Sequence, residues 1–330
     1  MKDFLLSYDS VCLRPKYSEL TSRNDADVTV NFLGHKFSLP VVPANMKDVI
    51  SYENAKFLSE TNHFYIMHRF NDANVFSKSF SDYCLVNDVK LKSISVGVND
   101  DSKSHLSSIR DYSMTPQFIT IDVAHGHHSK VRDMVKFIQD IFKPLNYDKD
   151  EMMLCKPRYP KIIAGNVATV DGYKFLCDLG VDAVKVGIGG GSICTTRYKT
   201  GFHLPTLQSV YECAALGLDI PIIADGGAKH YGDIAKALTL GATMVMSGGW
   251  FASCIDSPAK IIDGKKMYRG STSYEAKGEH KHIEGRTLEL EEGFIYEERL
   301  LEIKQALQSS ISYAGGKDLS AFNSVKWERI

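Results

Sequence analysis

Short apolar runs rich in Val and Ile recur along the chain, and most of them end in Gly, Asn, Asp or His. We count eight: Leu39–Asn45, His63–His68, Ser93–Val98, Phe118–Ala124, Lys161–Asn166, Ala183–Gly187, Pro221–Asp225 and Thr243–Ser247. Most are apolar throughout rather than alternating, as parallel strands buried on both faces are. The pattern therefore predicts a buried parallel sheet.

Helix-like stretches fill most of the gaps between these runs. They are Tyr52–Thr61, Ser102–Tyr112, Ser129–Phe142, Val170–Leu179, Leu204–Leu216 and Gly232–Leu240. Strand and helix that alternate eight times are typical of an α/β fold of the (β/α)8 TIM-barrel type. A doubly wound open sheet is the alternative, and periodicity alone does not separate the two. The count of eight strands favours the closed barrel.

Two regions depart from this rhythm. Pro144–Pro160 is a long polar connection before the fifth run, with no assigned role. Residues 263–292 are polar and rich in Lys, Glu and Gly, which suits a mobile flap over the barrel mouth, followed by a last helix near Ile295–Gln308. Since a barrel takes roughly 250 residues, we expect residues 1–330 to form a single barrel domain with this flap on its C-terminal face.

The charge balance gives no reason to expect a nucleic-acid or membrane partner. The chain carries 39 Lys and Arg against 40 Asp and Glu, a net charge of −1. Seven scattered cysteines without a C-x-x-C pair argue against a disulfide framework or a zinc ribbon. The first residues lack the apolar region of a signal peptide, and no apolar run reaches 18 residues. We expect a cytoplasmic protein.

The segment Val186–Arg197 carries the strongest chemical signal. Four glycines in the five positions after a strand let the backbone turn tightly and approach a ligand closely. Cys194 then lies at the carboxyl end of a barrel strand, where barrel enzymes hold their catalytic residues. Arg197 and the backbone donors of the loop favour a thiolate. A buried structural thiol is the alternative, but the glycine-rich setting and the flanking hydroxyl groups favour a nucleophile.

Two Gly-Gly pairs follow the last two strands, in Asp225-Gly226-Gly227 and Ser247-Gly248-Gly249. Loops after strands seven and eight of a barrel often hold a phosphate group, because glycines expose N–H donors there. Asp225 is suited to accept hydrogen bonds from ribose hydroxyl groups. Together the two pairs indicate a phosphorylated ligand.

The histidines of Asp122-Val123-Ala124-His125-Gly126-His127-His128 raise the question of a metal site. Zinc takes three or four N, S or O ligands, and adjacent residues on a turn seldom all point inward. We therefore favour an Asp122 that faces a ligand, with His127 and His128 on the surface. In the polar stretch Lys277–Glu284 we single out Glu284 as a proton carrier, against the alternative of a solvated flap face.

These residues resemble the superfamily of IMP dehydrogenases and GMP reductases. The resemblance rests on the Cys194 segment with Asp225-Gly226-Gly227, and it extends over nearly the whole chain. Other matching segments are Arg14-Pro15, Ser22-Arg23, Pro43–Met46, Met67–Arg69, Ala164–Val167 and Ser309–Gly316. Gly190 stands where the family usually has proline, and the 144–160 insertion is unusual, but neither departure removes a chemical group.

Several features favour the reductase branch of this superfamily. Between Arg69 and Ser93 there is no room for the paired regulatory domains that are usual in the dehydrogenases. The fourth strand ends in Asp122–Gly126, which is similar to the reductases, and the flap lacks the Arg-Tyr pair with which the dehydrogenases activate water. Lys199–Gly201 also looks like the reductases, and Ser309–Tyr313 resembles their bacterial form.

The resemblance implies NADPH-dependent reductive deamination of GMP to IMP and ammonia, a step of purine nucleotide salvage. It implies a covalent thioimidate on Cys194, with Thr196 and Glu284 protonating the departing amine. Cofactor residues would be Ser22, Arg23, Arg69, Asp122, Val123, Ala124, Gly187, Ile188, Ser309, Ser310, Ile311 and Ser312. Substrate residues would be Ser192, Asp225, Gly226, Gly227, Gly248, Gly249, Gly270, Ser271, Thr272, Gly285 and Arg286.

Two further expectations follow from the resemblance. A monovalent cation such as K⁺ would lie on the backbone carbonyls of Gly189, Gly191 and Cys194, with Arg197 nearby, and the protein would be a homotetramer. Three alternatives stay open from the sequence. They are an IMP dehydrogenase without regulatory domains, a purine-nucleotide-binding barrel without catalysis, and an FMN-dependent barrel oxidoreductase. The combination of Cys194, Thr196 and Glu284 argues against a mere sensor, which has no need of all three.

Overall fold

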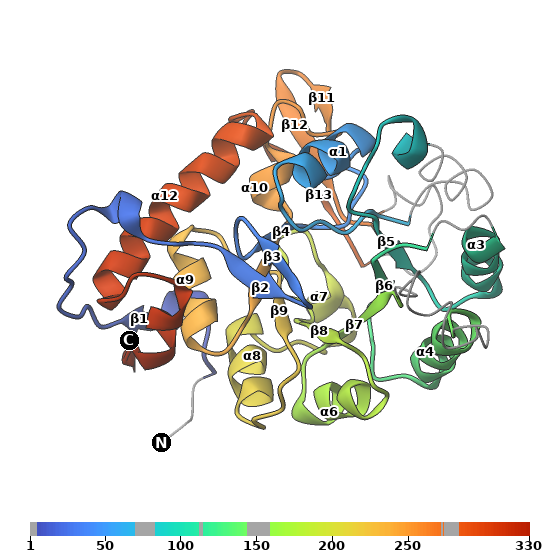
Figure 1. Ribbon diagram of the computed structural model, residues 1–330, viewed down its shortest axis with the longest axis horizontal. Helices are drawn as coiled ribbons and strands as arrows, with labels where there is room; N and C mark the ends of the chain where they lie inside the picture. The colour runs from blue at the N-terminus through green and yellow to red at the C-terminus, as the bar shows by residue number, and fades with distance from the viewer. Residues whose placement is uncertain (1–4, 70–82, 112–114, 144–158, 272, 274–283) are drawn as a thin grey trace, which may run out of the picture.

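The centre of the molecule is a parallel sheet wrapped by helices, shown in the computed structural model of Figure 1, which describes residues 5–69, 83–111, 115–143, 159–271, 273 and 284–330. Seven strands are joined by parallel ladders in one sheet. Their order is β4 (Val41–Pro43), β10 (Met244–Ser247), β9 (Ile222–Asp225), β8 (Ala183–Val186), β7 (Lys161–Val167), β6 (Phe118–Asp122) and β5 (Ser93–Val96).

The segment around Met67 takes the remaining position in the barrel. The Met67 N–H donates to the Ser93 carbonyl at 3.0 Å, and the Ser95 N–H donates to the Met67 carbonyl at 3.0 Å. This segment therefore forms a parallel bridge with β5. All eight apolar runs thus contribute to the barrel, and the predicted (β/α)8 TIM-barrel fold is confirmed.

Helices cover the outside of the barrel where the sequence predicts them. They are α1 (Tyr52–Glu60), α3 (Asp100–Asp111), α4 (Ser129–Ile141), α6 (Val170–Asp178), α8 (Thr206–Ala214) and α9 (Gly232–Thr239). Two short helices, α7 (Thr196–Thr200) and α10 (Gly249–Ala252), follow β8 and β10. Ser51 and Thr169 cap α1 and α6, since each hydroxyl accepts a hydrogen bond from a first-turn N–H that the helix itself leaves unpaired.

The last helix is longer than the sequence predicted. α12 runs over Tyr296–Ala314 and ends where Gly315 adopts a left-handed conformation with φ of 74°. The sequence pattern places its end near Gln308. Leu307 and Ile311 lie one turn apart and are buried, so an apolar face continues past the predicted end and holds the additional turns against the barrel.

Small antiparallel sheets lie outside the barrel. β1 (Val11–Leu13) pairs with β14 (Trp327–Arg329), and β2 (Val30–Phe32) pairs with β3 (His35–Phe37). β12 (Lys265–Arg269) pairs with both β11 (Lys260–Ile262) and β13 (Thr287–Leu290), at the top of Figure 1. Short 3-10 helices are η1 (Tyr8–Ser10), η2 (Arg23–Asp25) and η3 (Leu319–Ser324).

The sheet of β11, β12 and β13 contains the two described ends of the predicted flap. Its middle, residues 272 and 274–283, lies outside the described residues, as does most of the 144–160 connection. In the part of the chain that the structure describes, no helix is long and apolar enough to cross a membrane.

Candidate active site

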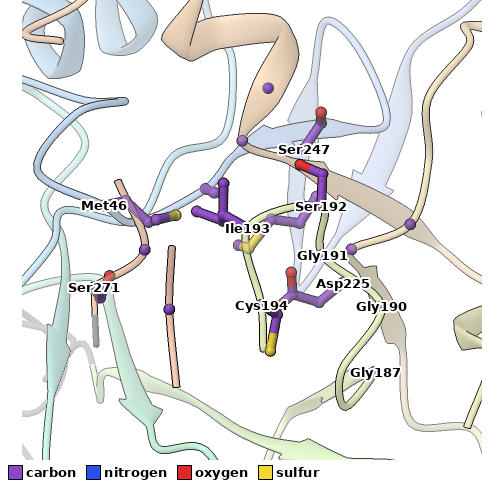
Figure 2. A pocket seen from close by; sticks show the side chains of 18 of the residues that line it. Met46, Gly187, Gly190, Gly191, Ser192, Ile193, Cys194, Asp225, Ser247 and Ser271 are labelled. Atoms are coloured by element: carbon purple, nitrogen blue, oxygen red, sulfur yellow. The ribbon is translucent and has the colours of Figure 1, made fainter. Parts of the chain in front are cut away.

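A cavity of about 820 Å³ opens where the barrel strands end, a size typical of pockets that hold small ligands. Figure 2 shows the loop from Gly187 to Cys194 running along it, with Met46 and Ser271 to the left of this loop in the view. The predicted site residues that line it are Arg69, Asp122, Val123, Ala124, Gly187, Ile188, Gly189, Gly191, Ser192, Cys194, Thr196, Asp225, Gly226, Gly227, Gly248, Gly249, Gly270, Ser271, Glu284 and Gly285. The barrel therefore gathers at one mouth residues that are far apart in the sequence.

The Cys loop, residues 187–195, follows β8 and borders the cavity. Gly187 has φ of +146°, and a Cβ added there would lie 2.1 Å from the carbonyl oxygen of Asp225. Only glycine lets the end of β8 pass so close to the end of β9. Ile193 is buried, at 5% exposure, the neighbouring Cys194 is half-buried, and both border the cavity.

Cys194 begins a chain of hydrogen bonds that ends on a carboxylate. Its Sγ lies 3.2 Å from Thr196 Oγ1, and the Thr196 hydroxyl donates to Glu284 Oε2 at 2.6 Å. The three candidate catalytic residues are thus in direct contact, although Glu284 lies 88 residues after Thr196. A proton can pass between the sulfur and the carboxylate through the hydroxyl group.

Main-chain hydrogen bonds hold Glu284 against the Cys loop. The Thr195 N–H donates to the Glu284 carbonyl at 2.8 Å, and Cys194 forms an antiparallel bridge with Gly285. These contacts involve backbone atoms alone. Strand-like pairing therefore fixes the main chain of Glu284 beside the Cys loop, and the Thr196 hydroxyl holds its carboxylate.

Arg286 connects three segments of the site without lining the cavity itself. Its N–H donates to the Ile193 carbonyl at 3.0 Å, and its carbonyl accepts the Gly270 N–H at 3.0 Å. Its guanidinium donates to the Ser192 carbonyl through Nε and Nη2, at 3.0 and 2.8 Å. Arg286 therefore supports the Cys loop from outside, which differs from the substrate contact that we predicted for it.

A buried lysine connects two of the predicted ligand-binding carboxylates. The side chain of Lys185, on β8, is 2% exposed, and its Nζ lies 2.7 Å from Asp122 Oδ1 and 3.2 Å from Asp225 Oδ2. Burial alone would raise the pKa of Asp122, but attraction and a hydrogen bond from Lys185, with Arg69 nearby, hold it below its ordinary value. Burial also opposes the charge on Lys185, yet the two carboxylates raise its pKa.

Asn166 fixes the orientation of Asp225. Its Nδ2 donates to Asp225 Oδ2 at 2.7 Å and to the Gly187 carbonyl at 2.7 Å. We assigned no role to Asn166 or Lys185 from the sequence. The sequence does carry a signal for each residue. Asn166 is a polar residue at the end of an apolar run, and Lys185 is a charged residue in the middle of one.

The two Gly-Gly pairs border the cavity at the ends of β9 and β10. Gly226 and Gly227 have φ of +86° and +89°. A Cβ added at Gly248 would lie 1.8 Å from the hydroxyl oxygen of Tyr268 on β12. The flap sheet therefore packs directly on the loop after β10, and glycine leaves room for both.

Six of the predicted cofactor residues lie apart from the cavity: Ser22, Arg23, Ser309, Ser310, Ile311 and Ser312. The Arg23 guanidinium donates to Ser309 Oγ at 3.4 Å and lies 5.9 Å from the ring centre of Tyr313, so η2 and α12 form their own cluster. Figure 1 shows α12 on the left, whereas β6, which ends at Asp122, lies on the right. One chain does not bring the two groups of predicted cofactor residues together.

Two other predicted site residues are Arg197 and Thr272. Arg197 is exposed on α7, and its guanidinium lies 4.4 Å from the ring centre of Tyr198. Thr272 lies outside the described residues. The structure therefore leaves both without a described contact to the cavity.

The histidines after β6 have separate partners. His128 caps α4 by accepting the Lys130 N–H at 3.1 Å, and His127 packs against Phe175 with ring centres 4.8 Å apart. Among the described residues, no group of three or more His, Cys, Asp or Glu is arranged to hold a metal ion. His128 thus serves the start of α4, and His127 contacts a side chain of α6.

Comparison with known proteins gives matches over nearly the full chain. Residues 5–327 match the family described as IMP dehydrogenase / GMP reductase domain. The chain is 41% identical over 332 residues to a GMP reductase of Staphylococcus epidermidis, covering 98% of this chain and 95% of the relative. It is 42% identical over 335 residues to a GMP reductase of Oenococcus oeni, covering 98% and 96%. A GMP reductase of Bacillus cereus is 40% identical over 338 residues, covering 99% and 96%.

Proposed function

The chain belongs to the IMP dehydrogenase / GMP reductase family, and from that premise we propose that it is an NADPH-dependent GMP reductase. It would convert GMP to IMP and ammonia in the cytoplasm, as part of purine salvage. The observation that carries the proposal is the hydrogen-bonded series Cys194–Thr196–Glu284, which supplies a nucleophile and a proton carrier at the mouth of one barrel.

A covalent intermediate on Cys194 divides the reaction into two easier steps, an addition and an elimination. The Cys194 thiolate adds to C2 of the GMP ring. Glu284 delivers a proton through Thr196 to the exocyclic amine, which leaves as ammonia, and a thioimidate on Cys194 remains. When bound, NADPH would supply the hydride that C2 requires, and Cys194 would then leave C2 as a thiolate to release IMP.

The cavity lining offers groups suited to both GMP and NADPH. Asp225, held by Asn166, is suited to accept hydrogen bonds from the GMP ribose, and the Gly226 and Gly248 loops are suited to its phosphate. Asp122 stays ionised beside Lys185 and lines the same cavity, where its carboxylate would accept hydrogen bonds from NADPH. Gly270, Ser271, Glu284 and Gly285, at the described ends of the predicted flap, line this cavity.

The separate cluster at Arg23 and Ser309 requires a second copy of the chain to reach a cofactor. Since this cluster lies away from Asp122, we infer that it completes the NADPH site of a neighbouring subunit, which fits a homotetramer. The Cys loop also offers carbonyl oxygens at Gly189, Gly191 and Cys194. Neutral carbonyls suit a weakly held monovalent cation such as K⁺, which would brace the loop.

The test is to follow absorbance at 340 nm with GMP and NADPH, and separately with IMP and NAD⁺. We expect NADPH oxidation that depends on GMP and yields IMP and ammonia. NADH formation from IMP and NAD⁺, without the first reaction, would instead make the protein a dehydrogenase.

Replacement of the thiol tests the mechanism itself. We expect Cys194→Ala to abolish turnover while GMP still binds, and Cys12→Ala, a control on the peripheral β1, to keep full activity. Activity of Cys194→Ala within tenfold of the wild type would remove this thiol from the mechanism.

A further inference from the structure

The buried ammonium group of Lys185 lies beside two carboxylates that we assign to different ligands, NADPH and GMP. It contacts Asp122 at the end of β6 and Asp225 at the end of β9, at 2.7 and 3.2 Å. A third neighbour, Asn45 Oδ1, lies at 3.4 Å, after β4. Lys185 lies on the strand between these elements, so one positive charge is shared by carboxylates from both sides.

The charges around this group do not balance without Lys185. Arg69 acts on Asp122 from the cavity side. Tyr8 and Tyr268 are close enough to Asp225 to sense its charge, but burial raises the pKa of both phenols and keeps them neutral. Removal of the ammonium would therefore leave two nearby carboxylates that repel each other and bind one proton between them, so that neither keeps its present charge and position.

We propose that Lys185 is a positioning residue that keeps the substrate carboxylate Asp225 and the cofactor carboxylate Asp122 in their binding form together. This inference rests on the proposed function, because it assigns the two carboxylates to GMP and NADPH. Its consequence is that one side chain, acting through these two carboxylates, sets the affinity for both ligands.

The direct test is the affinity of Lys185→Met for each ligand alone. GMP binding is measured by calorimetry, and NADPH binding by the change in its fluorescence. We expect both affinities to fall by about 10- to 100-fold, the range for losing a hydrogen bond to a charged group. Lys161→Met is the matched control: Lys161 also pairs with an aspartate at 2.7 Å on a barrel strand, but at the amino end. It should bind both ligands as the wild type does.

Double variants separate charge balance from packing. With Lys185→Met in place, Asp122→Asn removes the charge that repels Asp225, so GMP affinity recovers while NADPH affinity stays low. Asp225→Asn gives the reverse result. Both double variants carry less unbalanced buried charge than Lys185→Met, so they keep the test available if the single variant fails to fold.

Each outcome has a defined meaning. Loss of both affinities, with selective recovery in the double variants, supports the proposal. Loss of one affinity alone, or double variants in which the losses add instead of recovering, overturns it. Wild-type protein that binds neither GMP nor NADPH would instead refute the proposed function, before any Lys185 variant is considered.

Discussion

Glu284→Gln is the substitution that most sharply tests how a proton reaches the departing amine. Glutamine keeps the size of glutamate and an oxygen that accepts the Thr196 hydroxyl, which donates to Glu284 at 2.6 Å. It loses the ability to take and return a proton. The backbone contact of residue 284 with Thr195 at 2.8 Å does not involve the side chain, so the anchor of the flap remains.

The expected loss follows from the geometry of this relay. The Thr196 hydroxyl alone is a poor acid, so without the carboxylate the amine leaves unassisted. Positioned acid–base groups contribute about 10²- to 10⁴-fold, which corresponds to about 3–5 kcal/mol in the barrier. We expect GMP-dependent NADPH oxidation to fall by a factor in this range.

Two assays separate the proton step from the hydride step. Full turnover is followed with GMP and NADPH, and the partial reaction with IMP and NADP⁺ in one turnover, where no amine leaves. The partial reaction should suffer much less. Glu289→Gln, on the neighbouring β13 and paired with Lys265 at 3.5 Å, is the control and should leave both rates unchanged.

The reasoning is refuted by either of two results. If both reactions fall equally, Glu284 holds the flap or the nucleotide rather than moving a proton. If neither changes, the carboxylate belongs to the solvated face of the flap.

Three further predictions concern the support of the site. Replacing K⁺ by a bulky organic cation should lower the rate several-fold, and equal rates would exclude a cation on the Cys loop. Gly190→Ala should lower the free energy of unfolding by about 1–3 kcal/mol, because the added Cβ would lie 2.4 Å from Thr206 Oγ1. Calorimetry should show a lower unfolding temperature for this variant, and the additional substitution Thr206→Ala should restore that temperature. Asp48→Ala should remove the carboxylate that accepts hydrogen bonds from the guanidinium and the N–H of Arg269 on β12. Because this pair would help to position the flap, kcat should fall with little change in GMP affinity. An unchanged kcat would show that the pair does not position the flap.

The barrel was predictable because its strands are buried on both faces. Runs such as Lys161–Asn166 and Thr243–Ser247 are too short for a typical helix and too apolar to face solvent. A buried strand is therefore the structure that fits them best. The run around Met67 shows where pattern stops: it is as apolar as the others but joins the sheet by a single bridge. That difference depends on register with β5, which local sequence does not encode.

The candidate site was predictable where glycines and a cysteine cluster within a dozen residues. Lys185 escaped because a lysine in an apolar strand gains meaning only through Asp122 and Asp225, which lie 63 and 40 positions away and become its neighbours through strand order. The extension of α12 past Gln308 escaped for a similar reason. Its last turns are stabilised by packing against the barrel, which the helix propensities of the individual residues do not predict.

The pairing of Cys194 with Gly285 has a consequence for how this region tolerates change. Both ends of the segment between Gly270 and Glu284 are fastened, one by the Gly270 N–H on the Arg286 carbonyl and the other by the contact with Thr195. A substitution that keeps these two main-chain contacts would therefore leave the Glu284 carboxylate beside Thr196.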